Sequence, residues 1–384
     1  MDDDEVAVPE EEIEVLYFDD EDEEESNDVI EEDVDEFENI PFEEPEEFQT
    51  EVVDLSKYTF TRHGQSVFSS SLSKDGKIAV TGGEDDSAFV WILETGDVII
   101  ECTGHKDSVT EVLFNHDDQY VATGDMGGLI QVWSIIEKKL IWCYEVDDLE
   151  WLLWHPISNV LFCGTKSGDI YLWQVPSGTC KILPSHGVAS TCAKLLPDGK
   201  RLISGYSDGK LKLWDIKTVS SEWQLSDISD APLTSLSLSS DGNVCAIAPS
   251  GQVIKLQDGR IIGSILPDKE KDIEAVEFNN KLGLIATGSL SGRLCVWDIG
   301  KYTLRHEARI ESSVTIMKWT VTDKVLVGAA DGAIYVCDGK LGTLVETLTG
   351  HTAAILSLSI SEDGSTVLTT SDDGTAKIFN IRTG

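Results

Sequence analysis

The chain has 384 residues, with 29 Lys and Arg against 70 Asp and Glu, so its formal net charge is −41. Residues 1–56 hold 28 acids and no Lys or Arg, and the remaining residues are also acidic. This balance argues against a nucleic-acid backbone or an anionic membrane surface as the main partner. We therefore expect a cationic partner, with no direct nucleic-acid binding and no membrane association.

Cysteine usage and the N-terminal residues indicate the compartment. The eight cysteines are scattered singly and form no C-x-x-C pair, which is typical of reduced thiols in a cytosolic or nuclear protein. The N-terminus has acids where a signal peptide needs a basic region and an apolar stretch. We expect the protein to be located in the cytoplasm, and the same features are compatible with a nuclear location.

Residues 1–56 form the first predicted domain, a disordered acidic tail. Charge of this density repels itself too strongly for a packed core. Two apolar clusters interrupt the acids, at residues 13–18 and 37–42. Two interpretations stay open: a solubilising tail with incidental hydrophobic residues, or clusters that dock on a partner or on the protein's own body.

Residues 57–384 form the second predicted domain and contain an internal repeat of about 41 residues. Each unit ends in a short strand of alternating polarity that follows a Gly/Asp/Ser turn, which indicates an all-β repeat. A period of about 40–45 residues with Gly-His near the start and Trp-Asp at the end is typical of a propeller blade. We predict a single eight-bladed WD40 β-propeller preceded by the acidic tail. The final residues of the eight terminal strands are Trp91, Trp133, Trp173, Trp214, Leu256, Trp297, Cys337 and Phe379.

Ring closure follows from the two ends of the repeat array. The last unit stops before the outer strand that every earlier unit obtains from the following segment, while residues 57–62 form an unassigned strand before the first unit. Pairing the two would protect edges that an open sheet exposes. We predict that Tyr58 and Phe60 pack in blade eight beside residues 376–381.

Four histidines stand 28 residues before the end of their repeat unit, and the pattern resembles the WD-repeat family. In that family this His, a turn Asp, a strand Ser or Thr and the Trp form a buried hydrogen-bond network. In repeat two, Gly127 occupies the expected Asp position. The resemblance implies structural networks, which satisfy buried polar groups, at His63, Thr81, Asp85 and Trp91 and at His186, Ser204, Asp208 and Trp214.

Enzyme motifs are absent or out of context in the sequence. Residues 205–209 match the G-x-S-x-G string, but a strand rather than a helix follows them. No phosphate-binding loop or metalloprotease motif occurs, and Cys and His never adopt metal-site spacing. We therefore predict no catalytic residues, no metal site and no cofactor.

The turns before the Trp strands and the loops that lead into each blade should share one rim, where acids dominate. This is either ordinary turn chemistry or an acidic platform that captures a Lys/Arg-rich segment through charge-assisted hydrogen bonds. Trp151 aligns with Glu111, a position without an apolar requirement, so it is either an exposed anchor for a peptide or a filler between blades. The candidate partner-binding residues are Glu84, Asp107, Asp125, Asp147, Asp148, Glu150, Trp151, Asp272, Glu311 and Asp372.

The strings at residues 81–86, 104–110, 121–126, 148–156 and 196–201 resemble the angio-associated migratory cell protein family, and more distantly the fungal WD-repeat ribosome-assembly factors. The resemblance implies a non-catalytic binding protein, and together with the acidic loops it predicts an escort for a basic segment of a newly made large-subunit ribosomal protein. Because a closed propeller needs no partner to complete its fold, we expect a monomer. Changing Asp125 and Asp148 to Lys should then abolish binding with little effect on thermal stability. The alternative is a scaffold in signalling, cell migration or a ubiquitin-ligase complex.

Overall fold

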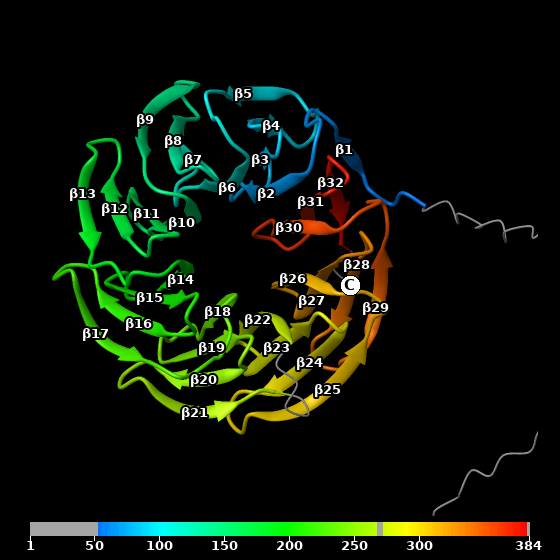
Figure 1. Ribbon diagram of the computed structural model, residues 1–384. Coiled ribbons are helices and arrows are strands. Elements are labelled where there is room, and N and C mark those ends of the chain that lie inside the picture. The colour runs from blue at the N-terminus through cyan, green and yellow to red at the C-terminus, as the bar shows by residue number, and fades with distance from the viewer. Residues whose placement is uncertain (1–52, 267–271, 382–384) are drawn as a thin grey trace, which may run out of the picture. The chain divides into compact units, whose positions relative to one another are not determined.

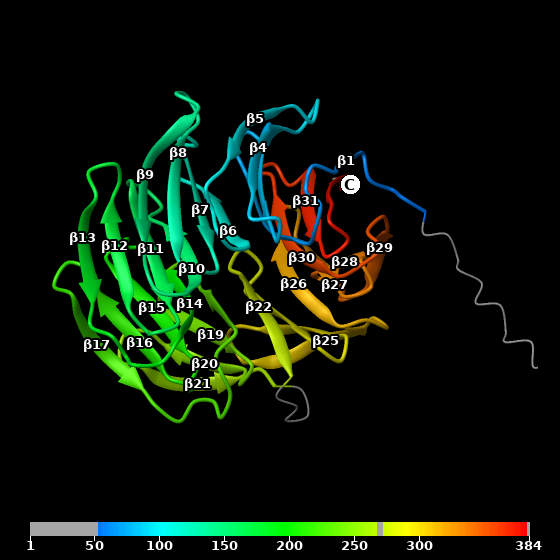
Figure 2. The ribbon, with the colours of Figure 1, turned by 45° about the horizontal axis from the view of Figure 1, so that its top comes forward.

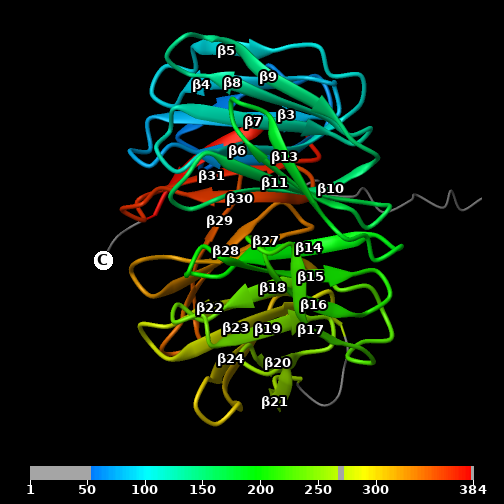
Figure 3. The same ribbon diagram turned by 90° about the vertical axis from the view of Figure 1, so that its left-hand side faces the viewer.

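The computed structural model describes residues 53–266 and 272–381 and confirms the eight-bladed propeller. The described strands form eight four-stranded antiparallel sheets arranged as blades around a central channel (Figure 1). In Figures 2 and 3 the strands run across the ring from one face to the other, so turns and connections gather on these two faces. Within the described ranges, no helix has the length and apolar character needed to cross a membrane.

Each blade contributes its first strand to the channel and its last strand to the outer edge (Figure 1). The strands of blades 1 to 4 are β2 Val67–Leu72, β3 Ile78–Gly83, β4 Ala88–Ile92 and β5 Val98–Cys102; β6 Val109–Phe114, β7 Tyr120–Asp125, β8 Leu129–Ser134 and β9 Lys139–Glu145; β10 Leu149–Trp154, β11 Val160–Thr165, β12 Ile170–Gln174 and β13 Thr179–Leu183; β14 Ser190–Leu195, β15 Arg201–Tyr206, β16 Leu211–Asp215 and β17 Ser220–Leu225.

The remaining four blades follow the same order. Their strands are β18 Ser235–Leu238, β19 Val244–Ala248, β20 Gln252–Lys255 and β21 Arg260–Ser264; β22 Ile273–Asn279, β23 Leu284–Ser289, β24 Arg293–Asp298 and β25 Thr303–Arg309; β26 Val314–Trp319, β27 Lys324–Ala329, β28 Ile334–Asp338 and β29 Leu344–Leu348; β30 Ile355–Ile360, β31 Thr366–Ser371 and β32 Ala376–Asn380, which β1 Tyr58–Phe60 completes.

The core lies between neighbouring blades rather than at the centre of the ring. Second strands such as β7 and β15 are buried over almost their whole length because a blade covers each of their faces, whereas β13 at the outer edge is mostly exposed. One apolar cluster, for example, joins Ile203 and Leu213 of blade 4 to Leu236 and Ile254 of blade 5. Each such side chain stabilises the fold by roughly 1.5–3 kcal/mol when fully buried.

Ring closure occurs as predicted. Strand β1 pairs antiparallel with β32, with Tyr58 opposite Ile378 and Phe60 opposite Ala376. The ring of Phe60 also stacks on Trp91 of blade 1 at a centroid distance of 4.4 Å. The N-terminal strand therefore completes blade 8 and packs against blade 1, and the sheet edge of blade 8 is covered.

The residues just before β1 also contact the propeller. Leu55 donates its backbone N–H to the carbonyl of Thr349 at 2.9 Å, and Lys377 donates to the carboxylate of Asp54 at 2.6 Å. Residues 53–56, which the sequence analysis assigned to the tail, therefore contact blade 8. The rest of the predicted tail, residues 1–52, lies outside the described residues.

Candidate partner-binding face and channel

The connections between blades and the turns between second and third strands lie on one side of the ring, which we call the interblade face. Backbone hydrogen bonds tie the two sets together around the ring, as between the amide of Glu84 and the carbonyl of Ser66 at 2.8 Å. The described part of this face comprises residues 61–66, 84–87, 103–108, 126–128, 146–148, 166–169, 184–189, 207–210, 226–234, 249–251, 265–266, 272, 290–292, 310–313, 330–333, 349–354 and 372–375.

Acids outnumber bases several-fold on the described interblade face. Two of its bases already hold local partners: Lys166 lies 3.3 Å from Asp148, and Lys210 lies 2.7 Å from Asp208. The turns of the opposite face carry many more bases, namely Lys74, Lys77, Lys138, Lys200, Lys217, Lys281, Lys301 and Lys340. The charge is therefore distributed unevenly, with the negative potential concentrated on the interblade face.

The structure places the ten predicted partner-binding residues in three different environments. Five side chains are exposed on the interblade face: Glu84, Asp107, Asp147, Glu311 and Asp372. Three are half-buried: Asp148, Glu150 and Asp272. Two are buried: Asp125 and Trp151.

The expectation that Asp125 is a surface acid is wrong. Its carboxylate accepts hydrogen bonds from Nδ1 of His105 at 3.0 Å and from the amide of Leu129 at 2.8 Å, while Nε2 of His105 contacts Thr123 at 2.8 Å. Burial opposes ionisation of Asp125 and is the largest single effect, but the hydrogen bonds from His105 and from the backbone amides of Leu129 and Lys106 together outweigh it and lower the pKa of the carboxyl. Asp125 thus fills the structural role that the sequence analysis left empty at Gly127.

The interpretation of Trp151 as an exposed anchor is also wrong. The side chain is only 7% exposed and donates its indole N–H to Ser190 of the next blade at 3.2 Å. It lies against Gly164, where an added Cβ would overlap the ring. This third position of the inner strand faces the neighbouring blade or the channel rather than the solvent, which is why its alignment with Glu111 did not indicate exposure.

The first predicted network is assembled except for its tryptophan. Nδ1 of His63 donates to Asp85 at 3.0 Å, and Nε2 accepts from Thr81 at 2.9 Å. Burial is the largest single effect on the pKa of Asp85 and raises it, but the bond from His63 and the backbone amides of Gly64 and Ser87 together lower the pKa. The indole nitrogen of Trp91 has no hydrogen-bond partner among the described residues, and its ring stacks on Phe60 instead.

The second predicted network is split into two parts by Tyr206. His186 contacts Asp208 at 3.0 Å, and Trp214 donates to Ser204 at 3.0 Å. Ser204 donates to the hydroxyl of Tyr206, whose ring lies 4.4 Å from that of His186. The histidine therefore reaches the strand serine only through the intervening tyrosine.

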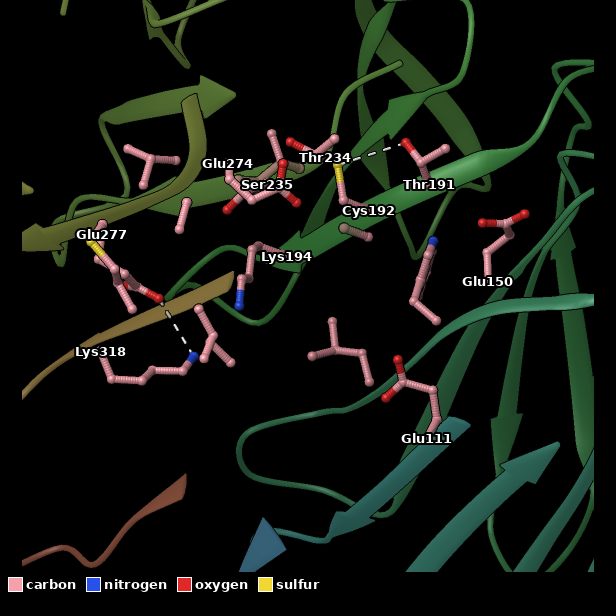
Figure 4. Close-up of a pocket in the computed structure, with 18 of the residues that line it drawn as sticks. Glu111, Glu150, Thr191, Cys192, Lys194, Thr234, Ser235, Glu274, Glu277 and Lys318 are labelled. Carbon is pink, nitrogen blue, oxygen red and sulfur yellow. Dashed lines mark hydrogen bonds and ion pairs between the residues drawn. The ribbon is translucent and has the colours of Figure 1, made fainter. Parts of the chain in front are cut away.

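A cavity of about 400 Å³ opens inside the channel, between the inner strands of blades 2 to 7 (Figure 4). Its volume lies within the roughly 300–1,000 Å³ range of ligand pockets. Glu277 and Lys318 face each other across it with 3.4 Å between Oε1 and Nζ. The charged lining residues are Glu111, Glu150, Lys194, Glu274, Glu277 and Lys318.

Bulges in the inner strands bring two of these acids into the cavity. The register between inner and second strands shifts on either side of Glu150 and again on either side of Glu274. A bulge leaves one residue unpaired and changes the direction of its side chain. Burial raises the pKa of both carboxyls. The sequence analysis selected Glu150 as a rim acid and missed the other channel residues, whose only signal was a charge within an otherwise apolar inner strand.

The described residues hold no cluster of three or more His, Cys, Asp or Glu side chains with the geometry to bind a metal ion. Burial raises the pKa of the Cys192 thiol, which also lines the cavity, to about 12. Such a thiol stays protonated and is a poor nucleophile. The interblade face and the channel therefore present a set of carboxylates with few local counter-ions, which can bind cationic groups.

A closed ring of four-stranded blades with His–Asp contacts at its turns defines a WD-repeat β-propeller, and the family described as "WD domain, G-beta repeat" matches residues 55–91, 96–134, 178–215 and 342–380. The angio-associated migratory cell protein of Homo sapiens is 38% identical over 350 residues, covering 86% of this chain and 81% of the human protein. The chain belongs to the angio-associated migratory cell protein family of WD-repeat proteins.

Two more distant similarities concern ribosome assembly. The ribosome assembly protein SQT1 of Saccharomyces cerevisiae is 22% identical over 387 residues, covering 86% of this chain and 88% of the yeast protein. The crystal structure of Chaetomium thermophilum Sqt1 bound to the N-terminus of ribosomal protein L10 superimposes with a TM-score of 0.79 at 21% identity, covering 86% of this chain and 100% of that one. At this identity the structural similarity shows the shared fold.

Proposed function

We propose that the protein is a non-catalytic escort that binds a Lys/Arg-rich segment of a newly made large-subunit ribosomal protein on its interblade face. The observation that carries the proposal is the excess of exposed carboxylates on that face, represented by Glu84, Asp107, Asp147, Glu311 and Asp372. Carboxylates arranged around a ring suit an extended cationic peptide, which they bind through charge-assisted hydrogen bonds.

The fungal relatives supply the chemical class of the partner. The yeast relative is named for ribosome assembly, and the Chaetomium protein of the same fold binds the N-terminus of ribosomal protein L10. Neutralising a basic segment in the cytosol would prevent premature contacts with RNA. Ribosomal RNA, with its denser phosphate charge, would later take the segment over.

The test is a titration of the N-terminal peptide of ribosomal protein L10 into the full-length protein by calorimetry. Asp147→Lys combined with Glu311→Lys should weaken binding by at least tenfold, because both side chains are exposed and have no hydrogen-bond or ion-pair partner among the described residues. Raising the salt from about 50 to 300 mM should weaken binding of the unaltered protein, since exposed charges are screened beyond about 10 Å at 0.1 M salt.

The matched control reverses two acids on the opposite face, Glu94→Lys with Glu362→Lys. Both are exposed and lie in turns remote from the interblade face, so the net charge changes equally while binding should stay within twofold of the unaltered protein. Equal affinity of both double variants would refute the proposed face. Affinity purification distinguishes the escort from the alternative function, a scaffold. Recovery of one ribosomal protein in near-equal amount supports the escort, and recovery of kinases, receptors or ligase subunits supports a scaffold.

A further inference from the structure

The channel holds half-buried carboxylates that the fold does not use. Glu111, Glu150 and Glu274 line the cavity, and none of them has a hydrogen-bond or ion-pair partner among the described residues. Glu111 is half-buried in the channel wall, and burial is the main effect on its carboxyl. A charge held in such a place without a partner is costly, and perturbed groups in a cavity are candidates for binding.

From this arrangement we infer that the channel cavity binds an ammonium or guanidinium group presented by the basic segment on the interblade face. The inference deepens the proposed function and rests on it for the source of the cation. Glu111 from β6, Glu150 from β10 and Glu274 from β22 surround the space on different sides (Figure 4). A long basic side chain can place its charged end between them while its aliphatic stem passes along the wall.

The acidic surface of the interblade face continues into this cavity. Glu150 follows the interblade residue Asp148 by two positions, and Glu274 follows Asp272 in the same way. Both glutamates are the second residues of their inner strands and therefore lie at the interblade end of the channel. A segment held on the face can reach the cavity with a single side chain.

The cations already in the channel leave the three carboxylates unsatisfied. Lys318 is paired with Glu277 at 3.4 Å. Lys194 projects into the same space as Glu111 (Figure 4), but no carboxylate lies within 4 Å of it among the described residues. Burial, together with the nearby Lys318, lowers the pKa of Lys194, so its charge is itself disfavoured. The channel acids thus outnumber the available cations.

Proton release distinguishes binding in the channel from binding on the interblade face alone. Burial raises the pKa of Glu111 to about 8, and the charge of Lys194 offsets only part of that effect. The other charged groups facing it are Glu150 on β10, Glu274 and Glu277 on β22, and Lys318 on β26. At neutral pH Glu111 is mostly protonated, so pairing with a cation must release a proton. With a pKa of about 8, the ionised fraction rises about 25-fold from pH 6.5 to pH 8.5, and affinity should follow it.

The experiment titrates the N-acetylated N-terminal peptide of ribosomal protein L10 into the full-length chain at pH 6.5, 7.0 and 8.5. Each titration is repeated in buffers of different ionisation enthalpy, and acetylation removes the peptide's own amine from the proton count. The unaltered protein should release part of a proton at pH 7.0 and bind about 10- to 25-fold more tightly at pH 8.5 than at 6.5. Glu111→Gln should lose both effects and bind at least fivefold more weakly at pH 8.5, with Glu274→Gln as a second variant should the first fail to fold.

The outcomes separate this inference from the proposed function. Peptide binding that is unchanged in Glu111→Gln, with no proton release from the unaltered protein, overturns the channel site and leaves the interblade face standing. If the unaltered protein binds no peptide, the proposed function fails, and a titration with spermine decides the channel separately. Spermine binding that Glu111→Gln removes supports a cation site for a free polyamine, and absence of spermine binding overturns it.

Discussion

Replacing Asp125 with Ala tests whether this carboxylate is structural. The change removes the acceptor for His105, whose side chain is fully buried, and for the amide of Leu129. Hydrogen bonds to a charged group contribute about 1.5–3 kcal/mol each, and a donor left buried without a partner costs about 1–3 kcal/mol. Because the two donors can recover part of this from water or a neighbour, we expect the free energy of unfolding to fall by about 2–4 kcal/mol.

Urea unfolding followed by tryptophan fluorescence measures the loss, and Asp147→Ala is the matched control. Asp147 is exposed and has no hydrogen-bond or ion-pair partner among the described residues, so its loss should change stability by no more than about 0.5 kcal/mol. Equal stability of the two variants would refute the structural role of Asp125. The result also matters for binding studies, because loss of binding in Asp125→Lys would report unfolding of blade 2 rather than loss of a contact.

Three further predictions concern the packing between blades and the His–Asp contacts. Trp151→Ala should cost about 3–5 kcal/mol, as for other buried aromatic residues, and a loss below 1 kcal/mol in urea unfolding would contradict its buried position between blades 3 and 4. Phe60→Ala should open the closure of the ring, so that trypsin cuts near Arg62 at least tenfold faster than in the unaltered protein; an unchanged rate would mean that β1 is held without this ring. The lowered pKa values of Asp85 and Asp125 predict stability that is present above the usual aspartate value of about 3.9 and lost as pH falls through the lower folded values. Asp85→Asn should therefore show a smaller drop in the urea midpoint between pH 5 and pH 2 than the unaltered protein, and equal drops would count against the ion pair.

The repeat spacing was sufficient to predict the blades and their closure. A spacing of 40–42 residues between terminal strands leaves room for four short strands and their turns, and the missing outer strand of the last unit has one available partner near the N-terminus. Both inferences depend only on counting residues along the chain. Both inferences hold when turn lengths vary, because insertions within a turn do not change which strands pair.

The channel could not be predicted in the same way, because its lining depends on where the inner strands bulge. At a regular strand, alternation would assign one face to the channel and the other to the neighbouring blade. A bulge at the second residue of the inner strand interrupts that alternation in blade 3 and, at the same position, in blade 2. The aligned residues Trp151 and Glu111 both line the cavity, and Trp151 also donates to Ser190 of blade 4. A sequence shows the residues at a bulge but not the register shift that sets their direction.

The His–Asp contacts vary through one position, the last residue of the second strand, which touches the histidine ring. Where this residue is Gly83, an added Cβ would lie 2.8 Å from Nδ1 of His63, and the ring bonds the turn aspartate Asp85. In blade 8 it is Ser371, and His351 bonds the turn aspartate Asp373 at 2.8 Å. In blade 2 the same position is Asp125, which supplies the carboxylate from the strand itself, and in blade 4 it is Tyr206, which separates His186 from the strand serine. A fixed offset of six residues from the end of the repeat unit finds the aspartate partner in blades 1, 4 and 8 but not in blade 2, where the histidine bonds the carboxylate of the strand residue itself. The four blades that carry this histidine therefore share a backbone but differ in the residues that surround the ring, because the residue at this position differs.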